Sequence, residues 1–310
     1  THAAPLWQET ERALEQTLRA ALPQVGAVRI TRVIHDRPAQ KLGEVGLAAK
    51  SVIAIGSGKG GVGKSTIAAS VALGLKRAGC IVGLLDADVY GPSIPHLLGV
   101  RGQPEMIDKR IRPVYCDGMP MMSMGFMIRR DQAVMWRGPM LHGAITQFLR
   151  DTDWGTLDYL IIDMPPGTGD VALSLSQLLP ITGAVVVCTP QDVALLDAAK
   201  AIAMFRQVNI PVLGMIENMS GFICPDCQKR YDIFGSGGVA KEAREAGVPF
   251  LGEVPINMQI RVHGDEGKTT ANFQDATVAP YLEKICVQLA RNLAENAARN
   301  PVVPSLPVLG

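Results

Sequence analysis

Short apolar runs alternate with stretches of helical periodicity along most of this chain. Six of the runs are rich in Val, Ile and Leu and are apolar at nearly every position. Such runs are typical of strands that are buried on both faces of a parallel sheet. The predicted strands are Val52–Gly56, Cys80–Leu85, Leu157–Ile162, Gly183–Thr189, Val212–Ile216 and Phe250–Val254.

Segments with apolar residues at every third or fourth position, the period of an amphipathic helix, separate these runs. The alternation of strand and helix favours an α/β fold with an open, doubly wound and mainly parallel sheet. Ligands of such sheets bind at the carboxyl ends of the strands, so we expect the chemistry there. The predicted helices are Lys64–Ala78, Met140–Arg150, Val171–Leu179, Asp192–Gln207, Gly238–Ala246 and Val278–Ala298.

The two ends of the chain depart from this alternation. The first segment holds an amphipathic helix at Trp7–Leu22, an alternating strand at Val25–Ile34 and a connector at Arg37–Ala49. One helix and one strand cannot bury both of their faces alone, so we expect a short α+β appendage that packs on the main body or is part of a larger domain. The last segment is rich in proline and predicts an extended tail. The three predicted segments are residues 1–49, 50–300 and 301–310.

Composition narrows the class of protein further. The chain has 310 residues, of which 47% are hydrophobic and 19% charged, and its net charge is +1. High apolar content with low net charge excludes a disordered protein, and the near-neutral charge gives no bias toward nucleic acid or anionic lipid. No apolar run approaches the roughly 18 residues of a membrane span, and the first residues lack a signal pattern. We therefore expect a soluble cytoplasmic protein that binds neither nucleic acid nor membrane.

A glycine-rich segment after the first predicted strand matches the phosphate-binding pattern G-x-x-x-x-G-K-S/T, with Gly58, Gly63, Lys64 and Ser65 in the fixed places. Its backbone N–H groups can surround phosphates at the positive end of the following helix. Lys64 would neutralise the β and γ phosphates, and the Ser65 hydroxyl would bind Mg²⁺. A chance glycine-rich turn is the alternative, and the flanking strand and helix argue against it. The predicted nucleotide-binding residues of this loop are Gly58, Lys59, Gly60, Gly61, Val62, Gly63, Lys64, Ser65 and Thr66.

Carboxylates at the ends of two other predicted strands would complete a site for ATP and Mg²⁺. Asp86 and Asp88 follow the second apolar run, and Asp163 ends the third in the form of a Walker B element. We expect Asp163 to hold the magnesium through water and Asp86 to contribute to the same metal site. The alternative for each acid is the cap of a helix N-terminus. The glycine-containing loop Gly167–Asp170 is expected to sense a γ-phosphate.

The pair Cys224 and Cys227, separated by two residues, is typical of metal or redox chemistry. Two thiolates at this spacing can bind one side of a soft metal centre. Zinc or an iron–sulfur cluster normally takes four ligands. His263 and the remaining cysteines are candidates for the other ligands, and a symmetric dimer that supplies two pairs is the more economical solution. A bridging cluster, a shared zinc ion and a redox disulfide are the three hypotheses. The remaining cysteines are Cys80, Cys116, Cys188 and Cys286, of which the last two have the pattern of core residues.

Lys59 is an extra lysine that the basic phosphate-binding pattern does not require. With it, Gly58–Thr66 resembles the deviant Walker A loop of the MinD, ParA and nitrogenase iron protein class of P-loop NTPases. This resemblance implies that Lys59 reaches across a dimer interface to the partner's nucleotide. It also implies that Asp88 lies near the attacking water, so the expected catalytic residues are Lys59, Lys64 and Asp88.

Further blocks of sequence together resemble the Mrp/ApbC family of iron–sulfur cluster carrier ATPases. The resemblance implies a homodimeric, slow ATPase that binds a 4Fe–4S cluster between its subunits and passes it to apo-proteins, with cluster-assembly factors as further partners. It implies adenine recognition by Asn218 and cluster ligation by Cys224 and Cys227. Many bacterial members carry a small N-terminal domain, of which residues 7–36 look like the final helix and strand. The blocks are Gly58–Thr66, Asp86–Pro95, Trp136–Pro139, Asp163–Asp170, Thr189–Asp192, and Glu217–Ser220 with the cysteine pair.

Two other classes of function remain as alternatives. A spatial organiser of the MinD or ParA type would bind a membrane or DNA, but the last predicted helix mixes acidic and basic residues and the net charge is small. A nucleotide-driven electron donor like the nitrogenase iron protein would take its cluster ligands from two separated cysteines in each subunit, unlike the adjacent pair found here.

Overall fold

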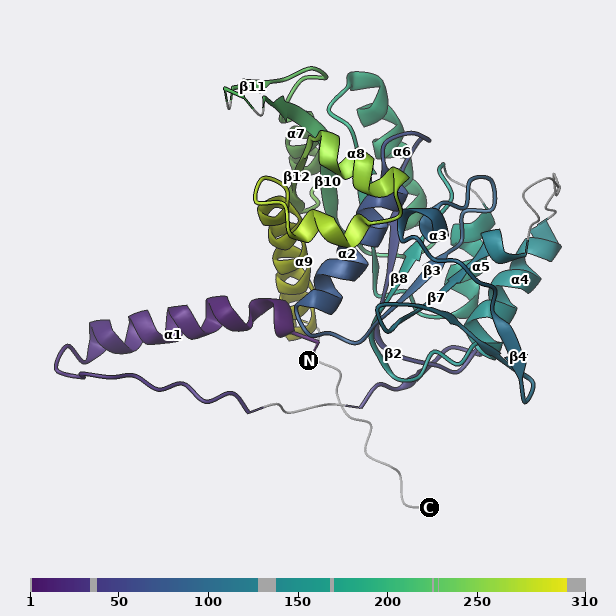
Figure 1. The fold of residues 1–310 in the computed structure, drawn as a ribbon, viewed down its shortest axis with the longest axis horizontal. Helices are drawn as coiled ribbons and strands as arrows, with labels where there is room; N and C mark the ends of the chain where they lie inside the picture. Colours follow the sequence, from purple (N-terminus) through teal and green to yellow (C-terminus); the bar gives the residue numbers. More distant parts are fainter. Residues whose placement is uncertain are drawn as a thin grey trace, which may run out of the picture.

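The computed structural model describes residues 2–33, 38–127, 138–167, 170–224, 226–227 and 229–299. Within these residues, one large sheet has the strand order β11-β10-β9-β2-β8-β3-β7-β6, with β1 paired to β2 and β12 paired to β10. The ladders between the central strands are parallel, and β1, β6 and β11 add antiparallel pairs at the margins. Helices cover both faces of the sheet (Figure 1), so the predicted fold class is confirmed.

The strands are β1 (Lys41–Leu42), β2 (Leu47–Gly56), β3 (Val82–Asp86), β4 (Glu105–Ile107), β5 (Arg110–Arg112), β6 (Val114–Cys116), β7 (Met119–Ser123), β8 (Leu157–Asp163), β9 (Gly183–Cys188), β10 (Val212–Ile223), β11 (Arg230–Tyr231) and β12 (Phe250–Ile256). The α-helices are α1 (Trp7–Ala21), α2 (Lys64–Arg77), α3 (Ile94–Leu97), α4 (Gly138–Asp151), α5 (Asp170–Leu178), α6 (Asp192–Gln207), α7 (Gly238–Glu245), α8 (Met258–Asp265) and α9 (Ala279–Arg299). Short 3₁₀ helices lie at Ala4–Leu6, Met124–Phe126 and Thr269–Phe273.

The central strand β2 shows why the predicted strands are apolar at every position. Its side chains point alternately to the two faces of the sheet. Val52 and Ala54 belong to one hydrophobic core, whereas Ile53 and Ile55 belong to the other. All four are fully buried, because helices lie on both sides.

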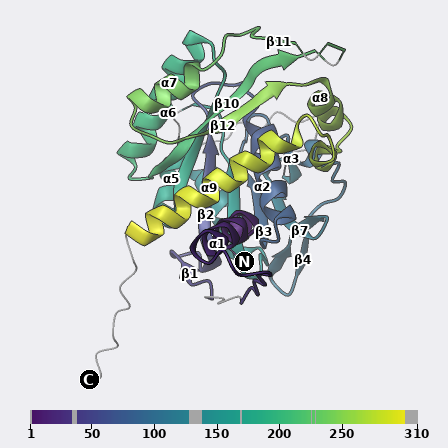
Figure 2. The same cartoon turned by 90° about the vertical axis from the view of Figure 1, so that its left-hand side faces the viewer.

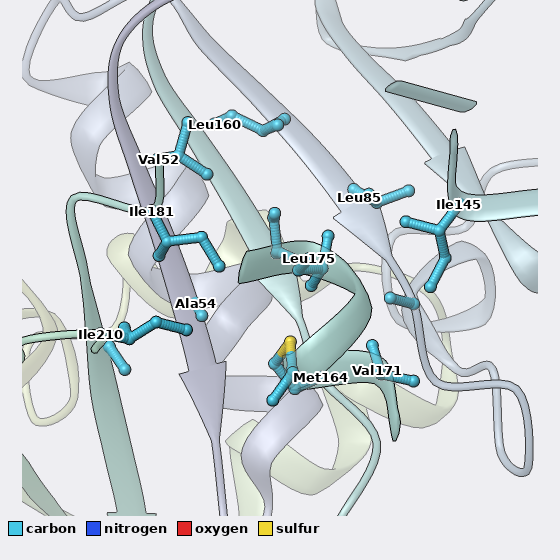
Figure 3. Close-up of a cluster of buried hydrophobic side chains, with 14 of the residues drawn as sticks. Val52, Ala54, Leu85, Ile145, Leu160, Met164, Val171, Leu175, Ile181 and Ile210 are labelled. Atoms are coloured by element: carbon cyan, nitrogen blue, oxygen red, sulfur yellow. The ribbon is translucent and has the colours of Figure 1, made fainter. Parts of the chain in front are cut away.

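The two cores are built from different helices. Helices α4, α5, α6 and α7 pack on the face that carries Val52 and Leu160, where Leu175 of α5 lies over the sheet (Figure 3). Helices α2, α3 and α9 pack on the opposite face, and Figure 2 shows α9 crossing in front of the central strands. The carboxyl end of β2, which carries the glycine-rich loop, is therefore held between two packed layers.

The N-terminal segment departs from its prediction. The helix α1 forms, but none of its residues is buried, and it projects from the body (Figure 1). The strand predicted at Val25–Ile34 is wrong for the residues that the structure describes, since 25–33 pair with no other strand. An alternating pattern needs a neighbouring edge to become a strand, and here the edge of β2 pairs with β1 instead.

The start of the chain is nevertheless attached to the body. Ala4 is buried among residues of the core on the α9 side. Arg291 of α9 bonds to Glu9 of α1 with 2.6 Å between Nη2 and Oε2. The predicted tail, residues 301–310, lies outside the described residues. None of the helices that the structure describes has both the length and the apolar character needed to cross a membrane.

Two leucines of α5 test the core packing. Leu175 is fully buried, whereas Leu173 on the same helix is 49% exposed. We expect Leu175→Ala to lower the free energy of unfolding by about 2–5 kcal/mol, because the cavity left in a packed core cannot fully collapse. Leu173→Ala is the matched control and should change it by less than about 0.5 kcal/mol. Urea unfolding measures both, and equal losses would contradict the packing described here.

Candidate functional site

The glycine-rich loop joins the carboxyl end of β2 to the start of α2. Gly63 precedes α2 with φ of 80°, a left-handed conformation that a residue with a side chain rarely adopts. A Cβ atom at Gly58 would lie 2.0 Å from the backbone oxygen of Asp197 on α6. The loop therefore needs glycine at both places, once for its turn and once for its close approach to α6.

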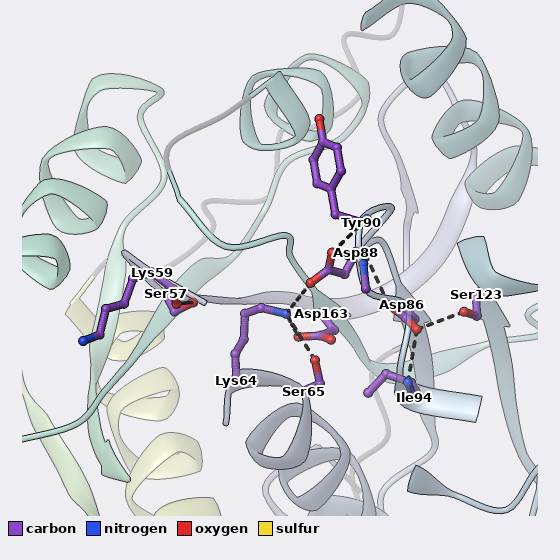
Figure 4. A network of polar contacts seen from close by, with 11 residues as sticks. Ser57, Lys59, Lys64, Ser65, Asp86, Asp88, Tyr90, Ile94, Ser123 and Asp163 are labelled. Atoms are coloured by element: carbon purple, nitrogen blue, oxygen red, sulfur yellow. Dashed lines mark hydrogen bonds and ion pairs between the residues drawn. The ribbon is translucent and has the colours of Figure 1, made fainter. Parts of the chain in front are cut away.

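Lys64, the first residue of α2, lies among carboxylates with 6% of its side chain exposed. Its Nζ donates to Asp163 Oδ1 at 2.7 Å and to Asp88 Oδ2 at 3.3 Å (Figure 4). Ser65 Oγ is 3.3 Å from the same Nζ. The other oxygen of Asp163, Oδ2, is buried without a hydrogen-bond partner among the described residues. A buried carboxylate oxygen of this kind beside a serine hydroxyl fits a hydrated Mg²⁺ ion.

Asp86 is fully buried behind this group. Its Oδ2 accepts hydrogen bonds from Ser123 Oγ at 2.9 Å and from the backbone N–H of Ile94 at 3.2 Å. Burial, together with the nearby charge of Asp163, raises the pKa of Asp86 to about 7. Burial also raises the pKa of Asp163, against the effect of Lys64. Asp86 and Asp163 are close enough for the charge of one to raise the pKa of the other, and a divalent cation bound beside them would reduce this repulsion.

Asp88 and Lys59 occupy different surroundings. Asp88 Oδ1 accepts from the backbone N–H groups of Tyr90 and Gly91, at 3.2 and 3.1 Å, and so holds the loop after β3. The side chain of Lys59 points away from Lys64 (Figure 4). The structure thus brings Lys64, Asp88 and their neighbours together and leaves Lys59 outside this group within one chain.

Two adjoining cavities flank the loop and share Gly63, Thr66 and Leu97 in their walls. One, of about 340 Å³, is lined by the glycine-rich loop and Asp88. The other, of about 560 Å³, is lined by Asn218, whose Nδ2 donates to the Val62 carbonyl at 2.8 Å. The sequence did not identify most of its walls, because they come from separate segments that carry no motif. These include Ser70, His96, Phe234, Ile256 and Ile260.

The cysteine pair lies at the tip of a hairpin. Strand β10 continues to Ile223, beyond its predicted end at Ile216, and β11 returns antiparallel to it at the upper margin of the molecule in Figure 1. Cys224 is half-buried and Cys227 is exposed. Hydrogen bonds from the backbone N–H groups of Cys227 and Asp226 lower the pKa of the Cys224 thiol, which favours its thiolate form.

The other candidate ligands of this metal site are placed elsewhere. His263 contacts Asn272 Oδ1 through Nδ1 at 2.8 Å. Cys188 and Cys286 are buried in β9 and α9, as expected of core residues, and Cys80 and Cys116 are buried too. Within the part of the chain that the structure describes, no group of three or more His, Cys, Asp and Glu side chains is set to hold a metal ion. The described part of one chain therefore offers two sulfur ligands at the cysteine hairpin, those of Cys224 and Cys227.

Some predicted residues lie outside the described part of the chain, and their structure is not described. They are Trp136 and Arg137 of one sequence block, Thr168 and Gly169 of the predicted γ-phosphate loop, and Pro225 between the two cysteines.

Comparison with known proteins gives a consistent result. Residues 48–290 match the ParA family described as NUBPL iron-transfer P-loop NTPase. The chain is 46% identical over 302 residues to the iron-sulfur cluster carrier protein of Deinococcus radiodurans, with 96% of this chain and 82% of that protein covered. It is 51% identical over 222 residues to the iron-sulfur cluster transfer protein NUBPL of Mus musculus, with 71% and 70% covered.

Solved structures share the fold. The nucleotide-binding protein of Archaeoglobus fulgidus, in complex with ADP, superposes with a TM-score of 0.64 at 40% identity, over 72% of this chain and 88% of that one. The cell division ATPase MinD of Pyrococcus furiosus superposes with a TM-score of 0.58 at 22% identity, over 80% of this chain and 100% of that one, a likeness of fold alone.

The raised pKa of Asp86 predicts a pH-dependent stability in protein free of nucleotide and divalent cation. A carboxyl group with a higher pKa in the folded chain binds more protons there, so stability falls as pH rises between the unfolded and folded pKa values. For Asp86 this window runs from 3.8 to about 7. We expect Asp86→Asn to lose less stability than the wild type between about pH 4 and pH 7, measured by urea unfolding at each pH.

The exposed Asp153 provides the matched control for this measurement. Asp153→Asn should keep the wild-type dependence of stability on pH. An Asp86→Asn variant whose stability falls as steeply as that of the wild type would contradict the assignment of the raised pKa to this carboxyl.

Proposed function

Since the chain belongs to the ParA family of NUBPL iron-transfer P-loop NTPases, we propose that it binds and hydrolyses ATP and carries an iron–sulfur cluster for transfer to apo-proteins. The observation that carries this proposal is the course of β10. This strand supplies Asn218 to the cavity beside the glycine-rich loop and leads directly into Cys224. One strand thus connects the proposed nucleotide site to the proposed cluster site.

The nucleotide half of the proposal rests on the residues around Lys64. The glycine-rich loop from Gly58 to Thr66 would surround the phosphates of ATP, with Lys64 neutralising their charge. Ser65, Asp86 and Asp163 would hold Mg²⁺, which when bound stabilises negative charge on the phosphates. Protein carboxylates usually provide only one or two ligands to Mg²⁺ in nucleotide sites, and substrate phosphates provide others.

Recognition and hydrolysis would use residues on either side of the loop. We propose that Asn218 recognises adenine, since it lines the larger cavity and is fixed by its bond to Val62. Asp88 would orient the attacking water, because it lies beside Lys64 and its carboxylate is fixed by two backbone N–H groups. Lys59 points away from this group, and we propose that it acts on the nucleotide of a second subunit.

The cluster half of the proposal rests on the exposed hairpin. A 4Fe–4S cluster needs four protein ligands, and the described part of one chain brings two sulfur atoms together. We propose that two copies of the chain form a homodimer in which both pairs of Cys224 and Cys227 hold one cluster, the cargo of the protein. Zinc bound by the same four thiolates is the competing outcome. The likeness to MinD is one of fold at 22% identity, so a spatial organiser has less support.

Two substitutions separate binding of ATP from its hydrolysis. Lys64→Ala removes charge-assisted hydrogen bonds, each of which contributes about 1.5–3 kcal/mol, so we expect ATP affinity to fall at least about tenfold by calorimetry. Asp88→Asn keeps an oxygen that can accept from the loop, so it should bind ATP normally. Its turnover should fall by about 100-fold or more if Asp88 positions the water.

Thermal unfolding must accompany these measurements, because Lys64→Ala leaves Asp163 buried without its cation. Tight ATP binding by a folded Lys64→Ala variant would contradict the proposed role of the loop. Undiminished turnover by Asp88→Asn would contradict the role given to that carboxylate.

Anaerobic reconstitution with iron and sulfide tests the cluster site. We expect about four iron atoms per dimer, with the visible absorbance of a cluster, and loss of both in Cys224→Ser and in Cys227→Ser. Cys116→Ala, which alters a buried cysteine of β6, is the control and should retain the iron. Full retention in both hairpin variants, or a bound metal that is zinc alone, would count against the proposal.

A further inference from the structure

Arg230, the first residue of β11, bonds to three different parts of the chain. Its Nη1 and Nη2 donate to the two carboxylate oxygens of Glu253 at 2.9 and 3.1 Å. Nη2 also donates to the backbone oxygen of Ser220 at 2.7 Å, and Nε donates to Asp232 Oδ1 at 2.9 Å. A bidentate arginine–carboxylate pair fixes the relative orientation of the two groups as well as their distance.

These bonds connect the cysteine hairpin to two strands that line the larger cavity. Ser220 follows Asn218 and Met219 on β10, and both of these residues line the cavity. Glu253 on β12 directly precedes Val254–Ile256, which form another wall. The guanidinium group of Arg230, close in sequence to Cys227, therefore contacts two adjacent strands that line the proposed base site.

The backbone of β10 is bent between the cavity and the hairpin. Met219 has φ of 58°, in the left-handed region that non-glycine residues rarely occupy. The ladder with β12 shifts register between Asn218 and Phe222. A Cβ atom at Gly221 would lie 2.9 Å from Arg230 Nε. The absence of a side chain at Gly221 thus leaves room for the guanidinium group.

A second contact holds the far end of the segment that follows β11. Glu217 is fully buried, and its carboxylate accepts from the backbone N–H groups of Gly237 and Val239 at 3.2 and 3.0 Å. Between Arg230 and this contact, Ile233 and Phe234 line the larger cavity. The segment is therefore attached to β10 at both ends, and its middle touches the space that a base would fill.

We propose that Arg230 is a positioning residue that couples occupancy of the larger cavity to the placement of Cys224 and Cys227. This inference rests on the proposed function, because it takes an adenine nucleotide as the ligand of that cavity. A bound base would press on Phe234 and on the wall from β10, and the guanidinium group would carry the displacement to the hairpin. The side chain of Arg230 is 37% exposed, and ion pairs this exposed contribute little to stability, so stabilisation alone is a weak reason for four bonds.

The reactivity of the two cysteines reports on this coupling. The experiment uses the full chain without a cluster and measures alkylation of Cys224 and Cys227 by iodoacetamide at one fixed pH, with and without ADP and Mg²⁺. Peptide mass spectrometry gives the rate at each cysteine. In the wild type we expect ADP to change at least one of the rates by about fivefold or more, the lower end of typical couplings between sites.

The variant Arg230→Gln should still bind ADP by calorimetry but lose this ADP-dependent change. Arg206→Gln is the matched control, since Arg206 on α6 also donates to a backbone oxygen, that of Ala246 at 2.6 Å. It should respond to ADP like the wild type. A second variant, Glu253→Ala, breaks the bond to β12 and should also lose the response. Combining it with Arg230→Gln should cause no further loss, because both act on one contact.

The outcomes distinguish this inference from the function on which it rests. If the wild type binds ADP and its alkylation rates do not change, the coupling is wrong while the nucleotide site stands. If the wild type does not bind ADP, the proposed function and the coupling both fail. A response that persists in Arg230→Gln, or that is also lost in Arg206→Gln, would overturn the role assigned to Arg230.

Discussion

The contact between Lys64 and Asp163 is the constraint on which the rest of this molecule depends. An ammonium group at the start of a helix is opposed by the helix dipole, and its burial adds a further cost unless an opposite charge is close. Asp163 lies opposite Asp86 in the ladder between β8 and β3, so both acids end their strands at the same level as the glycine-rich loop. The register of β2, β8 and β3 therefore places Asp163 beside Asp86 and close to Lys64.

The central part of the fold could be predicted from the sequence because its pattern is simple. The part of β2 from Val52 to Gly56 is covered on both faces, so its positions are apolar. Lys64 and Asp163 lie just beyond stretches that this pattern identifies as strands. The wrong prediction at Val25–Ile34 has an equally simple reason. An alternating pattern of apolar and polar residues indicates a strand with one buried face, but it does not show whether a neighbouring strand is available to pair with it. Strands β4 to β7 were missed because they are short and lie in a segment without clear periodicity.

The remaining site residues could not be predicted from local pattern, because their partners are distant in sequence. Glu217 and Asn218 look like the end of a strand, yet both are buried and bonded to backbone groups of the segment 237–239 and of the glycine-rich loop. Arg230 looks like a surface residue, yet Ser220 and Glu253 hold it in place. The two cysteines were identified from their spacing, whereas their place on an exposed hairpin required the extended course of β10.

The position of β2 has a consequence for the internal motions of the molecule. This strand is paired on one edge with β8 and on the other with β9, so its amide groups can exchange with solvent only when the middle of the sheet opens. Strand β11 pairs along one edge over two residues, and its amides are released by a small local opening. The backbone amides of β2, which leads into the glycine-rich loop, should therefore resist hydrogen exchange more strongly than those of β11 in the cysteine hairpin. The protein thus combines a rigid support for the glycine-rich loop with a more flexible hairpin that carries the cysteine pair.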